Sequence, residues 1–333
     1  MSSRETIPDM IRIAILSASA LFAFAITPAT ATAQEYPSRP IRIVVGYSPG
    51  AGIDFTARLF ADWLKKAFGQ SVIVENRPGA SGNIAAEYVS HAEPDGYTLI
   101  YAVGSDLEWT KFLTKQRTVE PLTELTPIAT VISAVNCVAV NASRPFATFK
   151  DLVDYTKQNP GKLTYGTAGT QSYYYLMGQA LKQQGVDMLP VPYTGNAPVA
   201  TALLAGETDA ALTALGAVSP YVKSGNVRIL AVMEPKRFSR MPDIPTISEI
   251  LPDFHAPRAW FGLFGPPGLP QPIVQKLSAE IGAALRSPEI DEKIENLDFN
   301  IFPTDAKDVR PLIVDSTETF RRLIETMNIQ PAD

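Results

Sequence analysis

The sequence is poor in the residues that carry covalent and metal chemistry. Its 333 residues include one cysteine, Cys137, and two histidines, His91 and His255. A single cysteine excludes an internal disulfide, and in an exported chain we expect it to be buried and inert. We expect His91 to be a solvated residue at a helix end, and we assign no ligand role to His255.

Catalytic and metal-binding motifs are lacking as well. Neither histidine lies near a serine, cysteine or carboxylate at the spacing of a catalytic triad, and there is no G-x-S-x-G elbow. H-E-x-x-H, C-x-x-C and EF-hand spacings do not occur, so the sequence predicts no metal and no cofactor. Asp106 and Glu108 form a carboxylate pair suited to acid–base work, although solvated loop residues are the commoner outcome. A binding protein is therefore favoured over an enzyme, with a cleft hydrolase using this pair as the alternative.

Positive charge is also scarce. The chain has 29 Lys and Arg residues against 34 Asp and Glu residues, which gives a formal net charge of −5. This balance argues against nucleic acid or an anionic membrane surface as partner. Backbone amides can still bind an anion locally in an acidic protein.

The chain opens with an export signal. Two arginines precede an apolar run, Ile13–Ile26, and the A-x-A sequence at 31–33 supplies a cleavage site. The run is too short for a transmembrane anchor, and no cysteine follows it for lipid attachment. We therefore predict that residues 1–33 are a signal peptide and that the mature chain starts at Gln34.

One strand–loop–helix unit organises the predicted fold. A β-branched run, Ile41–Val45, predicts a buried strand, residues 49–52 predict a tight turn, and a helix follows that ends at Gly69. Asp54 stands where the helix N-cap is expected. The backbone N–H groups and the dipole of such a helix start favour a carboxylate or a phosphate, although most units of this kind bind nothing. No Gly-Lys-Ser/Thr follows, and Phe55 replaces the third glycine of a dinucleotide fingerprint.

Strands and helices alternate twice along the chain. Strands at 71–75 and 97–103, with a helix at 84–91, predict a parallel sheet whose ligand loops lie at the carboxyl ends of its strands. The segment Gly104–Trp109 is expected to be such a loop. From Asn136 the alternation restarts, and a second loop of small residues, 166–172, precedes a helix.

The predicted architecture is α/β, with two domains and a ligand cleft between them. A helix capped by Thr148, with Asp151 as capping-box partner, belongs to the second domain. A strand at Trp260–Phe264 returns to the first domain, and amphipathic helices finish the chain. We predict that domain 1 comprises 34–136 and 255–333 and that domain 2 comprises 137–254. Two domains crossed twice by the chain describe a hinged binding protein.

Several stretches resemble one family of receptors. ENRPGA at 75–80 and PDGYTL at 94–99 are specific together, and KLTYGTAGTQS, VPYTG and RFSRMPDIPTISE before WFGLFGPPGLP agree with them. Over nearly all of the mature chain the sequence resembles the Bug/TctC proteins, the extracytoplasmic receptors of tripartite tricarboxylate transporters. The resemblance implies a type II periplasmic binding-protein fold, a periplasmic monomer without catalysis, and delivery of a small organic acid to membrane transporter subunits.

The resemblance also implies a ligand site. In the family, a carboxylate is held by backbone amides and bridging waters from two facing loops, which correspond here to 48–54 and 166–172. The hydroxyls of Thr170 and Ser172 can add donors, and Asp54 is either a helix cap or, in addition, an acceptor in the cleft. The residues implied are Tyr47, Ser48, Pro49, Gly50, Ala51, Gly52, Asp54, Ser105, Thr167, Ala168, Gly169, Thr170, Gln171, Ser172, Tyr175, Tyr193 and Thr213.

Departures from the family pattern bear on the ligand. Tyr47 stands where the family has an aromatic residue, but Ser48 replaces the proline that follows it. Gln171 replaces a glycine, Tyr175 a histidine and Thr213 an aspartate. Fewer charges and more tyrosine slightly favour an aromatic or uncharged-tailed carboxylate over an aliphatic di- or tricarboxylate. Part of the tyrosine run at 173–175 is alternatively core, because three adjacent helical residues cannot all face one cleft. A receptor that signals to a sensor kinase without transport is the alternative function.

Overall fold

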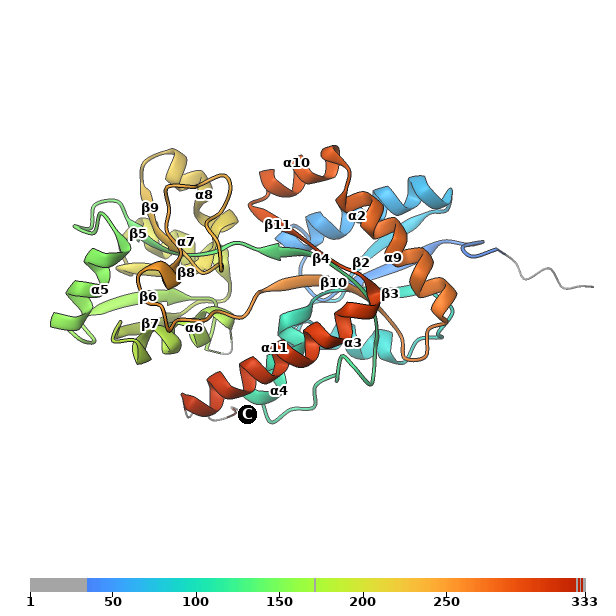
Figure 1. Ribbon diagram of the computed structural model, residues 1–333, viewed down its shortest axis with the longest axis horizontal. Helices are drawn as coiled ribbons and strands as arrows, with labels where there is room; N and C mark the ends of the chain where they lie inside the picture. The colour runs from blue at the N-terminus through green and yellow to red at the C-terminus, as the bar shows by residue number, and fades with distance from the viewer. Residues whose placement is uncertain (1–34, 171, 328, 330, 332–333) are drawn as a thin grey trace, which may run out of the picture. The chain divides into compact units, whose positions relative to one another are not determined.

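The computed structural model describes residues 35–333 except 171, 328, 330 and 332–333 (Figure 1). The predicted signal peptide and Gln34 lie outside the described residues. Residues 39–333 form one compact unit, and every contact given below lies within it. Its strands form a six-stranded and a five-stranded sheet, which are described in turn.

The first sheet has the strand order β11-β4-β10-β3-β1-β2. Its strands are β1 (Ile41–Val45), β2 (Val72–Asn76), β3 (Thr98–Val103), β4 (Thr126–Ala134), β10 (Trp260–Gly265) and β11 (Phe299–Thr304). The parallel pairing of β1 with β2 and β3 confirms the predicted parallel sheet, and β10 confirms the return of the chain. Strands β4 and β11, which the sequence reasoning missed, pair antiparallel to their neighbours.

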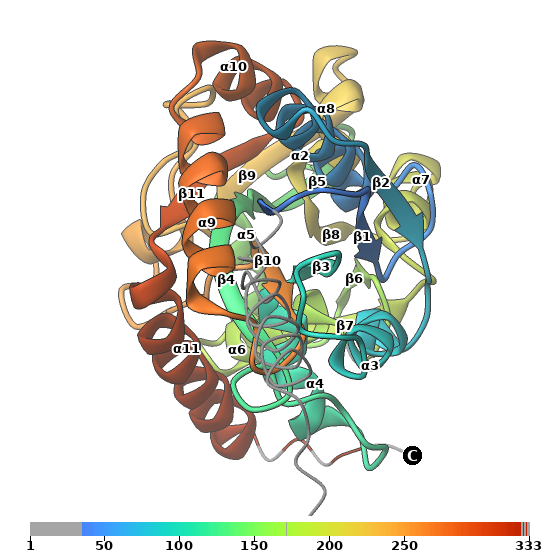
Figure 2. The same ribbon diagram turned by 90° about the vertical axis from the view of Figure 1, so that its right-hand side faces the viewer.

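Helices cover both faces of this sheet. They are α2 (Gly52–Phe68), α3 (Asn83–Ser90), α4 (Gly104–Leu113), α9 (Gln271–Leu285), α10 (Pro288–Asn296) and α11 (Ala306–Thr326), with a 3-10 turn, η2 (Ala80–Gly82). Figure 2 shows α2 on one side of β1 and β3 and α3 and α4 on the other. Strands covered on both faces need apolar side chains on both, which explains why every residue of β1 except the exposed Arg42 is apolar and buried.

The second sheet has the order β7-β6-β8-β5-β9. Its strands are β5 (Asn136–Asn141), β6 (Leu163–Thr167), β7 (Met188–Pro192), β8 (Ala210–Ala214) and β9 (Val227–Val232), and its helices are α5 (Phe149–Gln158), α6 (Tyr173–Gln183), α7 (Asn196–Ala205) and α8 (Leu215–Lys223). Strand β6 is parallel to β7 and β8, whereas β5 is antiparallel to β8 and β9. A 3-10 turn, η3 (Ile247–Glu249), lies in the proline-punctuated segment that follows.

Two local predictions for this region are confirmed. Thr148 caps α5, and its hydroxyl accepts from the Asp151 backbone N–H while the Asp151 carboxylate accepts from the Thr148 N–H, 2.8 Å away. Cys137 is fully buried on β5, and burial raises the pKa of its thiol. A thiol of raised pKa is a poor nucleophile.

Helices α4 and α11 complete the core of the second sheet. Trp109 of α4 lies 5.5 Å from the ring of Tyr173 and 4.8 Å from that of Phe320 on α11. All three belong to the hydrophobic cluster that also contains β5, α5 and α6 side chains. Packing therefore continues across the predicted domain boundary.

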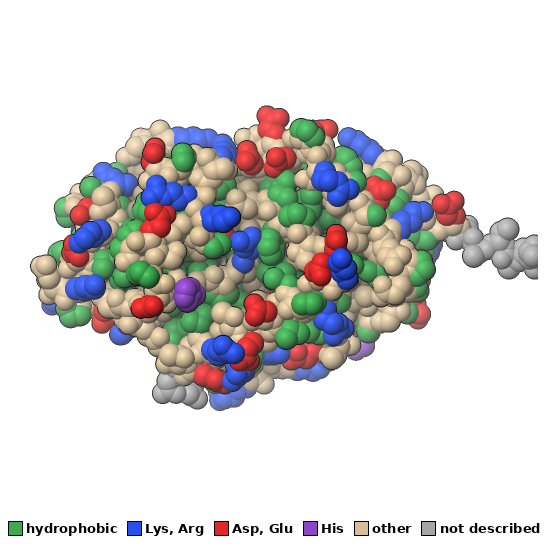
Figure 3. Space-filling model, viewed as in Figure 1, with side chains coloured by type: hydrophobic (Ala, Val, Ile, Leu, Met, Phe, Trp, Pro, Cys, Tyr) green, Lys and Arg blue, Asp and Glu red, His purple; other side chains and the backbone are tan. Residues whose placement is uncertain are grey.

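The surface carries both signs of charge. In Figure 3, Lys and Arg side chains are dispersed among Asp and Glu side chains without a large patch of one sign. No helix in the described part of the chain is long and apolar enough to span a membrane.

Candidate functional site

The topology brings the carboxyl ends of the parallel strands of both sheets to one junction. Because β3 and β4 both run antiparallel to β10, the last residue of β4, Ala134, lies at the same edge as the ends of β1 and β3. Strand β5 begins at Asn136, which pairs with Ala214 at the carboxyl end of β8. One residue, Val135, joins the two strands, so the two edges meet there (Figure 1). Ligands of α/β sheets bind at such edges.

The loop after β1 is organised by Asp54, but not as predicted. The N-cap of α2 is Ala51, and Asp54 lies within the first turn with 3% of its surface exposed. Its carboxylate accepts from the Gly50 N–H at 3.0 Å and from Asn76 Nδ2 at 2.8 Å, and it pairs with Arg58 at 2.9 Å. Burial opposes ionisation, but the hydrogen bonds from Arg58, Gly50 and Asn76 outweigh it and lower the pKa of Asp54.

This arrangement leaves fewer open amides than the sequence suggested. The Gly50 N–H is taken by Asp54, and the Ala51 N–H donates to the Ser48 carbonyl at 3.2 Å. The N–H groups of Gly52 and Ile53 have no acceptor among the described residues. Ser48, Pro49 and Gly52 are exposed, so the helix start itself is accessible.

The loop after β6 leaves more amides open. Ser172 caps α6: its hydroxyl accepts from the Tyr175 N–H at 3.2 Å and donates to the Gly169 carbonyl at 2.7 Å. The prediction of Ser172 as a ligand donor is therefore not supported, because that hydroxyl is already engaged. The N–H groups of Gly169, Thr170, Tyr173 and Tyr174 have no acceptor among the described residues.

The remaining residues of this second loop differ in exposure. Gly169 has a φ of +107°, which an L side chain rarely adopts. Thr167 is buried and its hydroxyl lies 3.0 Å from that of Ser172, whereas Ala168 is half-buried and Thr170 is exposed. The predicted ligand residue Gln171 lies outside the described residues.

The predicted loop at Gly104–Trp109 is instead the first part of α4. Strand β3 passes directly into the helix, whose N-cap is Val103. A Cβ on Gly104 would lie 2.2 Å from the ring of Trp260, so glycine is needed for the ring to pack on the helix start. The letters Gly-Ser-Asp indicated a turn, but this contact decides the conformation. Ser105 is fully buried there, and its hydroxyl has no partner among the described residues.

The expectation that Asp106 and Glu108 are solvated is wrong. Asp106 is partly buried and accepts a hydrogen bond from the Tyr47 hydroxyl. Glu108 has no exposed surface, and it accepts from Trp260 Nε1 at 3.2 Å and from the Ser316 hydroxyl. Burial raises the pKa of Asp106 to about 7 and that of Glu108 to about 8, with the hydrogen bonds opposing the shift. Glu108 thus links α4 to β10 and α11.

The tyrosine run divides between core and surface. Tyr173 is buried and donates to the Pro257 carbonyl at 2.9 Å, and Tyr174 is buried and donates to Asn136 Oδ1 at 2.9 Å. Tyr175 is half-exposed. The interpretation that part of the run is core is confirmed.

The structure also places the last two predicted residues. Tyr193 is half-buried, and its N–H donates to the Thr167 carbonyl at 2.8 Å, so it is tied to the second loop. Thr213 is fully buried at the end of β8, and its hydroxyl has no partner among the described residues. A buried hydroxyl without a partner costs about 1–3 kcal/mol, so Thr213 is a candidate for contact with a ligand or a water.

Sequence reasoning missed three polar residues at the edge of the second sheet. Asn136 is fully buried, Asn196 is half-buried at the start of α7, and Glu234 is buried just after β9. Burial raises the pKa of Glu234 to about 7, opposed by Arg258 and by the backbone amide of Asn136. The available sequence signals were an asparagine as the first residue of an apolar strand, Asn136, and another at a helix start directly after a glycine, Asn196.

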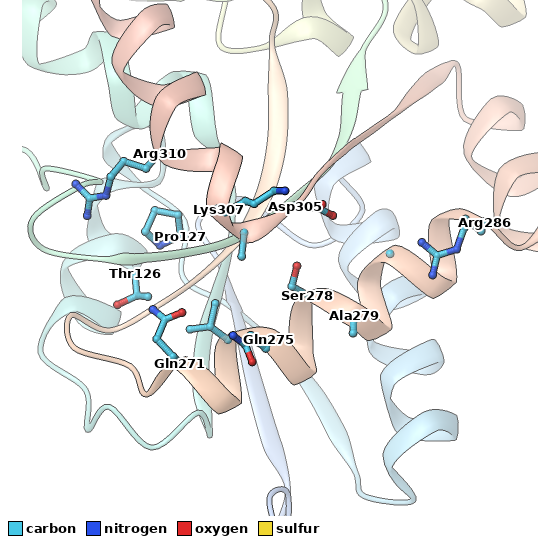
Figure 4. A pocket seen from close by; sticks show the side chains of 13 residues that line it. Thr126, Pro127, Gln271, Gln275, Ser278, Ala279, Arg286, Asp305, Lys307 and Arg310 are labelled. Atoms are coloured by element: carbon cyan, nitrogen blue, oxygen red, sulfur yellow. The ribbon is translucent and has the colours of Figure 1, made fainter.

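Two cavities lie away from this junction. One, of ≈ 590 Å³, is bounded by α9, the start of α11 and the start of β4 (Figure 4). Arg286, Lys307 and Arg310 lie around it with Asp305. The other, also ≈ 590 Å³, lies beside α3 and includes the exposed His91. None of the predicted ligand residues lines either cavity.

The described residues contain no group of three or more His, Cys, Asp or Glu side chains that could hold a metal ion.

Comparison with known proteins identifies the class. Residues 56–329 match the model of the tripartite tricarboxylate transporter family receptor, TctC, and the chain belongs to this family. The resemblance seen in the sequence is thereby confirmed. The family is one of periplasmic binding receptors, not enzymes.

Individual relatives cover nearly the whole chain. A UPF0065 protein of Bordetella bronchiseptica is 34% identical over 308 residues, which are 92% of this chain and 91% of the relative. The structure of Rpa4515 of R. palustris with adipate has a TM-score of 0.81 and 30% identity, and covers 90% of this chain and 100% of that one. The structure of MatC from Rhodopseudomonas palustris with bound malate has a TM-score of 0.75 and 28% identity, and covers 87% and 100%. The two-domain periplasmic binding-protein fold is thus shared.

Proposed function

We propose that this protein captures a small organic carboxylate at the junction of its two sheets and delivers it to the membrane subunits of a tripartite transporter. The observation that carries the proposal is the pair of helix starts, α2 and α6, whose first N–H groups have no acceptor among the described residues. Such N–H groups and the helix dipole favour an anion without any lysine or arginine. The adipate and malate bound by two structural relatives support a carboxylate.

The solute is held, in this proposal, by backbone amides and bridging waters from residues 48–54 and 166–172. The amides of Gly52 and Ile53 lie in the first segment, and those of Gly169 and Thr170 in the second. Charge-assisted hydrogen bonds from amides stabilise a carboxylate strongly in a water-poor site. The site then recognises the carboxylate group itself and leaves the rest of the solute to side chains.

The domain boundaries predicted from the sequence are part of the proposal. Domain 1 comprises 34–136 and 255–333, and domain 2 comprises 137–254. The passage of the chain between the sheets at Val135 and again between Val232 and Trp260 supports these limits. Closure would bring the two loops onto one ligand. Removal of residues 1–33 on export completes the picture of a periplasmic receptor.

Thermal-shift screening tests the binding step. The exported, processed protein is heated with citrate, aliphatic dicarboxylates, amino acids, nicotinate, benzoates and phthalates. A specific ligand at one hundred times its Kd should stabilise the fold by about 2.7 kcal/mol. The same screen on Ser172→Asp, which places a negative charge at the start of α6, should give a stabilisation smaller by at least about half. Absence of a shift with every acid would contradict the proposal, and turnover of any acid would revive the hydrolase alternative.

A further inference from the structure

We propose that the end of the solute remote from its bound carboxylate carries a hydrogen-bond donor, which pairs with the side-chain oxygen of Asn196, and that a second carboxylate is disfavoured at that position. The inference rests on the proposed function, because it concerns the same solute at the same junction. It deepens that function by naming the class of solute: a monocarboxylate with an amide, hydroxyl or ammonium group at its far end.

A chain of hydrogen bonds fixes the orientation of Asn196. Asn136 Nδ2 donates to the Ala134 carbonyl at 3.4 Å, which leaves Asn136 Oδ1 as an acceptor. The Tyr174 hydroxyl donates its single proton to that oxygen at 2.9 Å. Asn196 Nδ2 then donates to the Tyr174 oxygen at 3.4 Å. This series of hydrogen bonds connects the end of β4 with β5, α6 and the start of α7.

The donor-to-acceptor direction of these hydrogen bonds leaves Asn196 Oδ1 as an unpaired acceptor at the end of the series. A tyrosine has one proton, and Tyr174 has given it to Asn136, so Asn196 meets Tyr174 with its NH₂ group. Asn196 Oδ1 is therefore turned elsewhere, and it is buried without a partner among the described residues. Leaving a buried acceptor unpaired costs about 1–3 kcal/mol, which a ligand donor would recover. A carboxylate oxygen cannot fill this role, because it has no proton to donate.

The charges near this chain point the same way. Two carboxyls, Asp106 and Glu234, act electrostatically on the Tyr174 hydroxyl. Arg258, the cation that acts on Glu234, also stacks on the ring of Phe302 at 4.4 Å. A second carboxylate near Asn196 would meet partly ionised carboxyls, whereas a neutral or positive donor would not be repelled.

Access to Asn196 requires movement. Its Oδ1 is shielded from solvent in this structure. Asn196 begins α7 after Gly195, which has a φ of +157° and no atom within 4 Å of an added Cβ. A donor reaches the oxygen only when the segments around it separate, as happens when a hinged receptor opens. The hydrogen bond to the ligand would then form on closure.

The test is calorimetric titration of the exported, processed protein with matched sets of acids. Succinate, glutarate and adipate are each compared with their monoamide and with the ω-hydroxy acid of the same length. We expect the best monoamide or hydroxy acid to bind about tenfold more tightly than its dicarboxylate, the effect of one well-made hydrogen bond. Tighter binding of the dicarboxylate would overturn the inference and leave the proposed function standing. Failure of all acids to bind would overturn both.

Two variants tie the preference to Asn196. In Asn196→Ala we expect the preference for the monoamide or hydroxy acid over the dicarboxylate to shrink to about twofold. Tyr174→Phe keeps the buried ring but removes the hydroxyl that orients Asn196, and it should weaken the preference to an intermediate degree. Asn226→Ala, at an exposed asparagine bonded to Ser224, is the matched control. An undiminished preference in Asn196→Ala would refute the assignment.

Discussion

The two sheet edges that meet at Val135 differ in how their helix starts are capped. Each has a strand, a loop of small residues and a helix start, but the start of α2 is occupied by the ionised Asp54 of its own first turn. The start of α6 is capped by the neutral hydroxyl of Ser172. A helix start that already holds a carboxylate attracts a second anion less, because the internal charge offsets the dipole. The second edge should therefore contribute more of the attraction for a solute carboxylate.

The neighbouring side chains differ only in part. On the first edge, Asp106 and Glu108 are hydrogen-bonded within the protein, but the buried Ser105 hydroxyl has no partner among the described residues. On the second, Asn196 and Thr213 keep buried polar atoms without partners among the described residues. Unpaired buried groups are costly, and sites that bind ligands are where such costs are tolerated.

Removing Asp54 should have the largest effect on stability. Asp54→Ala leaves Arg58, Asn76 and the Gly50 N–H without their acceptor, and we expect a loss of about 2–3 kcal/mol in the free energy of unfolding. Urea denaturation measures it. Asp62→Ala, at an exposed position of the same helix, should cost no more than about 0.5 kcal/mol. Equal effects of the two variants would show that Asp54 does not organise the loop.

Giving the second edge a charge like that of the first should weaken binding. Ser172→Asp keeps a good N-cap but sets a carboxylate against the solute, and we expect at least about a tenfold rise in Kd. Ser172→Asn has nearly the same shape without the charge and should bind within about threefold of the natural protein. Titration calorimetry on both variants decides the point. Similar affinities of the two would mean that the start of α6 does not face the solute.

The pH dependence of stability should report the buried carboxyls. The pKa values of Asp106 and Glu234 are raised to about 7 and that of Glu108 to about 8. The folded chain thus keeps protons that the unfolded chain has already lost, so the free energy of unfolding should fall as the pH rises from about 5 to about 8. Glu108→Gln should flatten the decline in urea denaturation, and Glu93→Gln, an exposed control, should not. A stability that increases over this range would contradict the assignment.

Local sequence patterns were sufficient for most of the fold. The β-branched run of β1, the Thr148 and Asp151 capping box and the left-handed Gly69 at the end of α2 each follow from chemistry within a few residues. The alternation of strands and helices was likewise enough to predict parallel pairing. What failed depended on distant partners: Gly104 begins a helix because the ring of Trp260 packs on it.

The sequence by itself therefore predicted the export signal. It also determined the α/β class, the family and the position of the two loops along the chain. Only the tertiary structure decided which hydrogen-bonding groups of those loops remain available to a ligand. Asp54 occupies the start of α2 because its carboxylate accepts a hydrogen bond from Asn76 of β2 and pairs with Arg58. The open oxygen of Asn196 results from a relay through Tyr174 and Asn136 that no local pattern encodes. The physical reason is that a hydrogen-bonding group is committed or open according to neighbours that folding brings from far along the chain.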